Sequence, residues 1–137
     1  MYQARNQKNL NTMKKFLSTL TAVLVAANVF AAEFEEISME ELQAKIANNE
    51  VTVVDVNGTE SYNQGHIPGA IDYIAVKEDF ASKLPEDKDA LIVAYCGNER
   101  CGAYAQAAKA AKELGYTNVK HFKPGIAGWK ANGGKLE

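Results

Sequence analysis

The residues in this chain best suited to chemistry are two cysteines, Cys96 and Cys101, which are separated by four residues. Cys96 follows an apolar run, residues 90–95, and precedes a loop that is bounded by Gly97 and Gly102. Glycines let backbone N–H groups turn inward, and the start of the following helix adds the positive end of its dipole. Both features favour a negative sulfur. The pattern therefore predicts that the pKa of Cys96 is lowered and that its thiolate is a nucleophile.

The loop after Cys96 is also the predicted substrate-binding segment. Its inward amides suit the terminal sulfur of a persulfide, because that sulfur is an anion like the thiolate. The residues predicted to bind substrate are Gly97, Asn98, Glu99, Arg100, Cys101 and Gly102. The alternative is that Cys96 is a buried strand-end cysteine without chemistry, since free cysteines are common in protein cores.

The elements that would position Cys96 alternate between strands and helices from residue 34 onwards. The predicted strands are residues 34–37, 51–56, 70–75, 90–95 and 119–122. The predicted helices are residues 38–49, 59–64, 78–84, 103–114 and 126–131. This alternation predicts an α/β fold in which helices cover both faces of a parallel sheet. The working crevice of such a sheet lies beyond the carboxyl ends of its strands, where Cys96 would stand.

The N-terminal segment, residues 1–31, has the features of a secretory signal peptide. A basic start at residues 13–15 precedes an apolar stretch, residues 16–27, that is too short to span a membrane as a stable helix. We expect cleavage after Ala31, because small or modest side chains stand at the required positions before it. The alternative is an uncut membrane anchor.

Cleavage would leave a single domain over residues 32–137, in the periplasm or secreted, with no stable membrane span. Residues 1–12 precede a complete signal that begins at Met13, and we interpret them as an upstream misreading of the start codon. The segment removed carries four basic residues and no acidic one, so 11 of the 15 basic residues would remain against 17 acidic ones, a net charge of −6. An acidic surface of this kind argues against nucleic acid or anionic lipid as a partner.

Three segments resemble the signatures of the rhodanese family. The first lies at residues 55–70. It begins at Asp55 and ends with the sequence GHIPGA at residues 65–70. The second is PGIAGW at residues 124–129, and between them YCGN at residues 95–98 stands where the family has its catalytic cysteine. The resemblance extends over roughly residues 34–134.

The resemblance implies a three-layer fold with a five-stranded parallel sheet flanked by helices. It also implies sulfur transfer without a metal or an organic cofactor. Cys96 would accept a sulfane sulfur from a small donor such as thiosulfate or polysulfide, become a persulfide, and pass the sulfur to a thiol or other thiophilic acceptor. A thiol-bearing protein is one acceptor of this kind. Structural roles are implied for Asp55, His66, Gly69, Gly128 and Trp129.

The residues themselves favour the same structural roles. Asp55 at a strand end is suited to bonding nearby backbone groups, and His66 to anchoring its Pro-Gly loop. Trp129 is most simply a core side chain with a satisfied N–H.

The loop departs from the rhodanese pattern at Cys101. Many sulfurtransferases of this class have a basic residue at that position, whereas the only arginine here is one residue earlier, at Arg100. A thiosulfate sulfonate needs a fixed cationic partner, so the departure favours an uncharged or polysulfide donor. Cys101 could also act as a resolving thiol that attacks a Cys96 persulfide and leaves a disulfide. The alternative is that Cys101 is the buried first residue of the next helix.

Three other functions compete with sulfur transfer. One is a non-catalytic rhodanese-like sulfur carrier or regulatory binding module, which the missing basic residue favours. A phosphatase of related architecture requires an arginine at the end of a longer loop, and Gly102 stands there instead. A thioredoxin-like role is disfavoured because the chain has no Cys-x-x-Cys motif.

Overall fold

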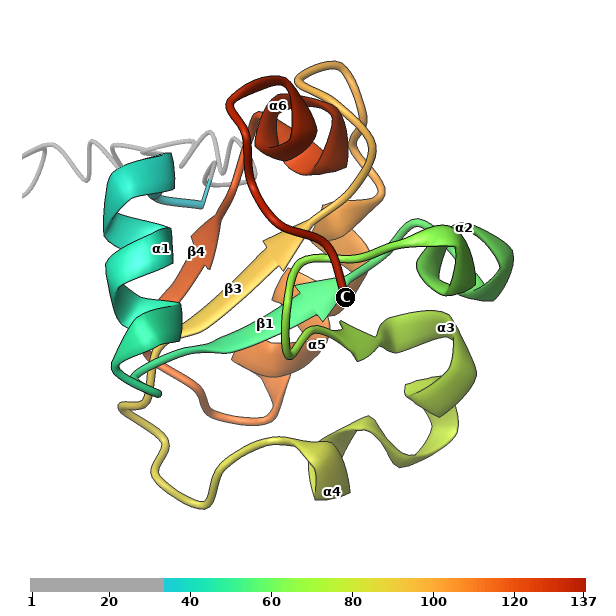
Figure 1. Ribbon diagram of the computed structural model, residues 1–137. Helices are drawn as coiled ribbons and strands as arrows, with labels where there is room; N and C mark the ends of the chain where they lie inside the picture. Colours follow the sequence, from blue (N-terminus) through green and yellow to red (C-terminus); the bar gives the residue numbers. More distant parts are fainter. Residues whose placement is uncertain (1–33) are drawn as a thin grey trace, which may run out of the picture. The chain divides into compact units, whose positions relative to one another are not determined.

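The centre of the fold is a parallel sheet with the strand order β2-β1-β3-β4 (Figure 1). The computed structural model describes residues 34–137, and the predicted signal peptide lies outside them. The strands are β1 (Thr52–Asp55), β2 (Ile71–Asp72), β3 (Ile92–Tyr95) and β4 (Val119–His121). Apolar and β-branched residues fill the two central strands, as expected for parallel strands that are covered on both faces.

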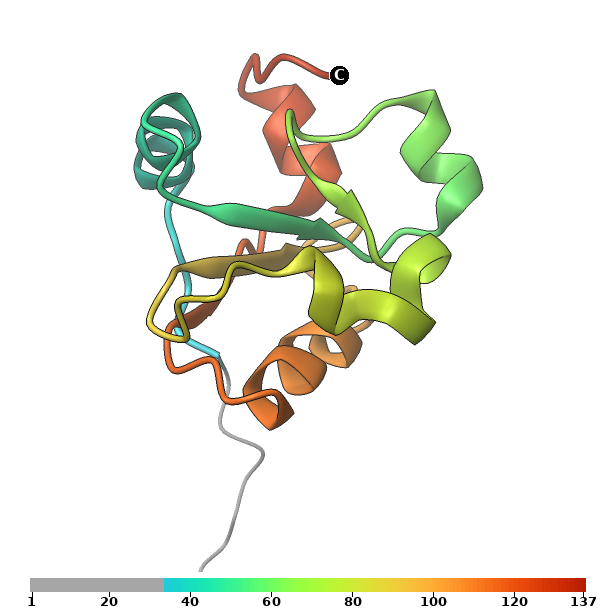
Figure 2. The same ribbon diagram turned by 90° about the horizontal axis from the view of Figure 1, so that it is seen from below.

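Helices cover both faces of this sheet, which gives three layers (Figure 2). They are α1 (Met39–Ala47), α2 (Thr59–Gln64), α3 (Tyr73–Val76), the 3₁₀ turn η2 (Lys77–Asp79), α4 (Phe80–Lys83), α5 (Tyr104–Glu113) and α6 (Gly125–Ala131). One core cluster joins α3, α4 and α5 to the sheet, and a second joins α1 and α6 to its other face. No helix within residues 34–137 has the length and apolar character to cross a membrane.

Side-chain alternation along β3 sends neighbouring residues into different cores. Val93 and Tyr95 belong to the cluster with α1 and α6, whereas Ala94 belongs to the cluster with α5. The predicted α/β class and parallel sheet are thus confirmed, and the predicted helix at residues 103–114 is found as α5 within one residue at each end.

The prediction of five strands is wrong within the described residues, because residues 34–37 do not form a strand. They make a single parallel bridge from Glu36 to His121. The backbone N–H of Ile37 donates to the His121 carbonyl at 3.0 Å. Pairing ends there because α1 begins at once, with the Ser38 side chain accepting a bond from the N–H of Glu41.

The predicted strand at residues 70–75 is also corrected, since β2 has only two residues before α3 begins. The reason is local. The side chain of Asp72 accepts a hydrogen bond from the N–H of Ala75 at 3.3 Å and so caps the first turn of α3. An aspartate within an apolar run is therefore a helix signal here, and its side chain competes with strand pairing.

Candidate active site

Cys96 directly follows β3, near the middle of the edge at which the parallel strands have their carboxyl ends. β3 lies between β1 and β4, and all four of its residues are buried. Tyr95 pairs in register with Asp55, the last residue of β1, so the two strands end side by side. The chain then enters the loop that leads to α5 (Figure 1). This is the position at which open α/β sheets commonly bind ligands.

A buried hydrogen-bond network holds the strand end just before Cys96. The Tyr95 hydroxyl donates to Asp55 Oδ2 at 2.6 Å and accepts from the N–H of Ile67 at 3.0 Å. The other carboxylate oxygen of Asp55 accepts from the N–H of Asn57 at 2.7 Å. Burial, followed by the Asp55 hydrogen bond, raises the pKa of Tyr95 well above its ordinary value, so the phenol remains a donor.

The Cys96 sulfur is enclosed, yet amide groups do point at it. Cys96 is 1% exposed, and its thiol donates to the Cys101 carbonyl at 3.2 Å. The N–H groups of Gly97 and Tyr104 donate to the sulfur, and the Cys101 thiol is a further hydrogen-bond partner. Burial first, and the Cys101 thiol second, raise the pKa of Cys96 to about 11. The predicted lowering is therefore wrong for this thiol, because the amides do not offset its desolvation.

The thiol with the lowered pKa is Cys101. Cys101 is half-buried, and both cysteines are free. Burial alone raises its pKa, but the Cys96 thiol and the N–H groups of Gly97 and Ala103 together bring the pKa of Cys101 below its ordinary value of 9.0. Of the two thiols, Cys101 is therefore the one that ionises more readily, and Cys96 the one that holds its hydrogen more firmly.

The alternative in which Cys101 is the buried first residue of the helix is wrong. α5 begins at Tyr104, so Cys101 lies in the loop rather than at the first residue of the helix. It lines a cavity of about 200 Å³ together with Phe34, Arg100 and Tyr104. Cys96 is not among the residues that line this cavity.

Asn98 shapes the loop between the two cysteines. Its carbonyl accepts from the N–H of Cys101 at 3.1 Å, and its side-chain oxygen accepts from the N–H of Arg100 at 2.9 Å. The predicted binding residues Glu99, Arg100 and Gly102 are exposed. The loop is thus ordered by its own backbone and one asparagine side chain, while its charged side chains face outward.

The start of α6 is hydrogen-bonded to the backbone of this loop. This contact was not predicted from the sequence. The N–H of Ile126 donates to the Cys96 carbonyl at 2.9 Å, and that of Ala127 donates to the Gly97 carbonyl at 3.0 Å. Gly125 has a φ of +63°, and a Cβ added there would lie 2.5 Å from the Cys96 carbonyl oxygen. The signal was present in the sequence as the Pro-Gly pair of the second signature, but its spatial partner was not.

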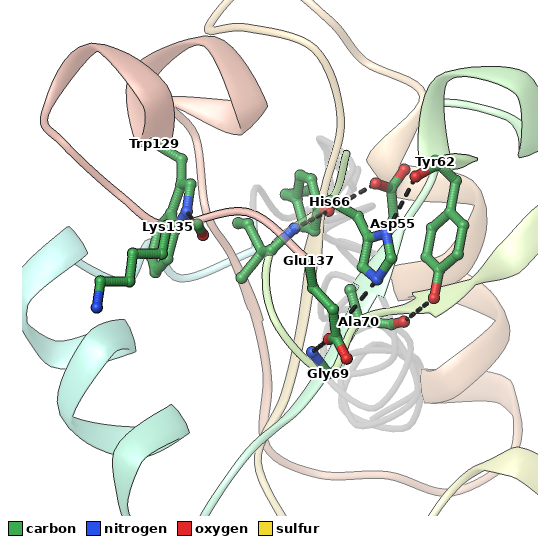
Figure 3. Close-up of polar contacts among 10 residues, drawn as sticks. Asp55, Tyr62, His66, Gly69, Ala70, Trp129, Lys135 and Glu137 are labelled. Carbon is green, nitrogen blue, oxygen red and sulfur yellow. Dashed lines mark hydrogen bonds and ion pairs between the residues drawn. The ribbon is translucent and has the colours of Figure 1, made fainter. Parts of the chain in front are cut away.

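His66 and Gly69 hold the first signature against the C-terminal segment. His66 Nδ1 lies 3.0 Å from the Tyr62 carbonyl, and the two rings stack at 3.7 Å. The backbone of His66 exchanges two hydrogen bonds with Glu137, whose carboxylate also accepts from the N–H of Gly69 at 2.6 Å (Figure 3). These contacts are structural, and they anchor the loop that also provides the Ile67 amide for Tyr95.

Trp129 and Gly128 belong to the packing of α6. Trp129 is buried against Phe122, and its Nε1–H donates to the Lys135 carbonyl at 2.8 Å (Figure 3). A Cβ added at Gly128 would lie 2.3 Å from Pro124 Cβ, so this position needs a residue without a side chain. Among the described residues, no group of three or more His, Cys, Asp or Glu side chains could hold a metal ion.

Two curated proteins are similar to this chain over most of its length. The HTH-type transcriptional regulator Rv0324 of Mycobacterium tuberculosis is 37% identical over 111 residues, which is 80% of this chain and 48% of that protein. The putative sulfur carrier protein YrkF of Bacillus subtilis is 29% identical over 101 residues, 72% of this chain and 52% of that protein. The chain thus spans about half the length of the curated relatives it matches.

Known structures and a family model agree with the fold. The human single-domain sulfurtransferase TSTD1 superposes with a TM-score of 0.55 at 22% identity, covering 70% of this chain and 95% of that one. The model of the rhodanese-like domain matches residues 38–132, which include both signatures and the loop with the two cysteines. The position of Cys96 at the carboxyl edge of a parallel sheet fits that match. The chain therefore belongs to the rhodanese-like domain family.

Proposed function

We propose that this protein is a sulfurtransferase that forms a persulfide on Cys96 and passes the sulfane sulfur to a thiol or another thiophilic acceptor. The observation that supports this proposal is the pair of N–H groups, from Gly97 and Tyr104, that donate to the Cys96 sulfur at the carboxyl edge of the sheet. The family match and the similarity to a putative sulfur carrier support it further.

The first step needs a Cys96 thiolate, and the neighbouring thiol provides a path for the proton. The Cys96 S–H is hydrogen-bonded to Cys101, whose pKa is lowered. Moving one proton across this hydrogen bond makes Cys96 the nucleophile, in the way that an adjacent base activates other catalytic nucleophiles. The Cys96 sulfur then bonds to the sulfane sulfur of the donor, the donor's own bond to that sulfur breaks, and the leaving group takes the electron pair.

Polysulfide fits this loop better than thiosulfate as a donor. Arg100 is the only cationic residue between Cys96 and α5, and it is exposed. A solvent-exposed cation contributes about 1 kcal/mol or less to binding an anion, which is roughly a fivefold effect. The loop therefore lacks the fixed, buried cation that a sulfonate group requires.

A donor panel tests this assignment. We expect transfer to cyanide and to a dithiol to be faster from polysulfide than from thiosulfate or mercaptopyruvate. In Arg100→Ala, the KM for thiosulfate should rise about fivefold and the KM for a neutral organic polysulfide should change less than about twofold. The matched control is Lys130→Ala on the exposed side of α6, which should alter neither value. An equal loss with both donors would mean that Arg100 shapes the loop rather than binding anions.

The second candidate is a non-catalytic sulfur carrier or regulatory binding module. It is favoured by the burial of Cys96, by its raised pKa and by the absence of a basic residue at Cys101. The two functions differ in turnover. A carrier accepts one sulfur per chain in the donor panel and then stops, whereas a sulfurtransferase consumes many equivalents of donor in the presence of an acceptor.

We also propose that the protein works in the periplasm or outside the cell, after removal of residues 1–31. The support is the basic, apolar and small-residue order of residues 13–31. N-terminal sequencing of the protein recovered from an exported fraction should begin at Ala32. Recovery of the intact N-terminus in a membrane fraction would show instead that the segment is an uncut anchor.

A further inference from the structure

Cys101 is the more accessible of the two cysteines. Cys96 is 1% exposed, whereas Cys101 is half-buried and lines the cavity of about 200 Å³ in front of α5. The aromatic rings of Phe34 and Tyr104 form part of the cavity wall. A thiol from solvent can therefore approach the Cys101 sulfur through this cavity, while the Cys96 sulfur lies behind the loop.

The same loop brings the two cysteines together, since the Cys96 thiol donates to the Cys101 carbonyl at 3.2 Å. The thiols share a hydrogen bond, and the N–H of Gly97 donates to both of them. The turn at Asn98 closes the loop, since its carbonyl accepts from the N–H of Cys101 at 3.1 Å. Two thiols that are neighbours in one closed loop are placed to react with each other when one of them carries a persulfide.

The chemical consequence rests on the proposed Cys96 persulfide. We propose that Cys101 is a second catalytic residue, which attacks the inner sulfur of that persulfide and releases the sulfane sulfur as hydrosulfide. The Cys101 thiolate forms a bond to Cys96 Sγ, the bond between Sγ and the terminal sulfur breaks, and the terminal sulfur leaves with the electron pair. The sulfane sulfur is reduced by two electrons, and the two cysteines are oxidised to a disulfide.

A dithiol from solvent completes the cycle by reducing the Cys96–Cys101 disulfide. One dithiol sulfur attacks Cys101 Sγ through the cavity and Cys96 leaves as a thiolate. The second dithiol sulfur then bonds to the first and Cys101 leaves, so that the dithiol becomes a disulfide and both cysteines return as thiols. The lowered pKa of Cys101 is consistent with this order, because a thiol that ionises readily is both an available attacker and a good leaving group. The substrate class of the second half-reaction is therefore a dithiol.

The test is a single turnover of the 137-residue chain. The reduced protein is loaded to completion with polysulfide, separated from excess donor, and followed by sulfide trapping and by non-reducing intact mass. The wild-type chain should release one sulfide per chain, lose the added sulfur, and finish two hydrogens lighter than the reduced protein. Cys101→Ser should keep the added sulfur and release sulfide at least about tenfold more slowly.

Controls separate this inference from the proposed function and from folding. Lys109→Ser, on the exposed side of α5, should release sulfide at the wild-type rate, and Cys101→Ala should behave like Cys101→Ser. Release by both Cys101 variants at the wild-type rate, or wild-type release without the loss of two hydrogens, overturns the inference. The mass change is measured on the wild-type chain, so this result does not depend on whether any variant folds. A Cys101→Ser chain that gains no sulfur, together with a wild-type chain that keeps its reduced mass, would instead refute the proposed function.

Discussion

Cys96→Ser should abolish sulfur transfer while leaving the fold almost unchanged. A serine hydroxyl has nearly the size of the thiol and can still donate to the Cys101 carbonyl, so the stability should change by about 1 kcal/mol or less. The oxygen cannot carry a sulfane sulfur as a persulfide, so turnover with polysulfide and a dithiol should fall by about three orders of magnitude or more. Steady-state sulfide release, with circular dichroism as a fold check, measures both effects.

Cys101→Ser is the matched comparison for this variant, because it removes the other thiol of the same loop. It should still accept one sulfur from polysulfide, whereas Cys96→Ser should accept none. Turnover of Cys96→Ser above about a tenth of the wild-type rate would remove Cys96 from the assigned role, since loss of an essential nucleophile costs far more than that.

Gly125→Ala should lower both stability and sulfur loading, because the added Cβ would collide with the backbone that carries Cys96. The new Cβ would lie 2.5 Å from the Cys96 carbonyl oxygen and 2.8 Å from the Asn98 nitrogen, and no flexible side chain is there to move aside. The left-handed φ of +63° adds strain for any residue other than glycine. Strain and overpacking together should lower the free energy of unfolding by about 3 kcal/mol, as measured by urea unfolding.

The same substitution should reduce sulfur loading onto Cys96 about a hundredfold, because a shift of about 1 Å in a reacting group can cost that much. The shift is expected because the N–H groups of Ile126 and Ala127 hold the carbonyls of Cys96 and Gly97. Gly115→Ala is the matched control: its φ is +96°, but no atom lies within 4 Å of the added Cβ.

Gly115→Ala should therefore lose about 1 kcal/mol from the backbone strain alone and load sulfur normally. Equal losses of stability in the two glycine variants, with loading intact in both, would show that the contact beneath the loop does not position Cys96.

Elements with strong local signals could be predicted from the sequence. α5 follows from ten residues rich in alanine and lysine, with Gly115 after them, and β3 from an apolar run that ends at Cys96. The strand predicted at residues 34–37 failed because strand pairing is decided by distant partners, here only a bridge to His121. The strand predicted at residues 70–75 failed because the Asp72 cap competes with pairing.

The electrostatics of the site were harder to predict. Glycines and a helix start correctly indicated amides near Cys96, but the sequence does not show how deeply the folded chain buries this residue. That burial raises the pKa of Cys96, whereas the pKa of Cys101 is lowered. The Tyr95–Asp55 hydrogen bond was missed for a similar reason. It joins residues 40 positions apart and follows only from the register of β1 and β3.

The most direct test of the account is to locate the sulfur within the first turnover. The wild-type chain is mixed with polysulfide, quenched at once with an alkylating agent, digested, and examined by tandem mass spectrometry. We predict one additional sulfur on Cys96 and none on Cys101. Additional sulfur on Cys101 alone, or on neither cysteine while both are alkylated as free thiols, would contradict the claim that the enclosed sulfur at the end of β3 receives the sulfane atom.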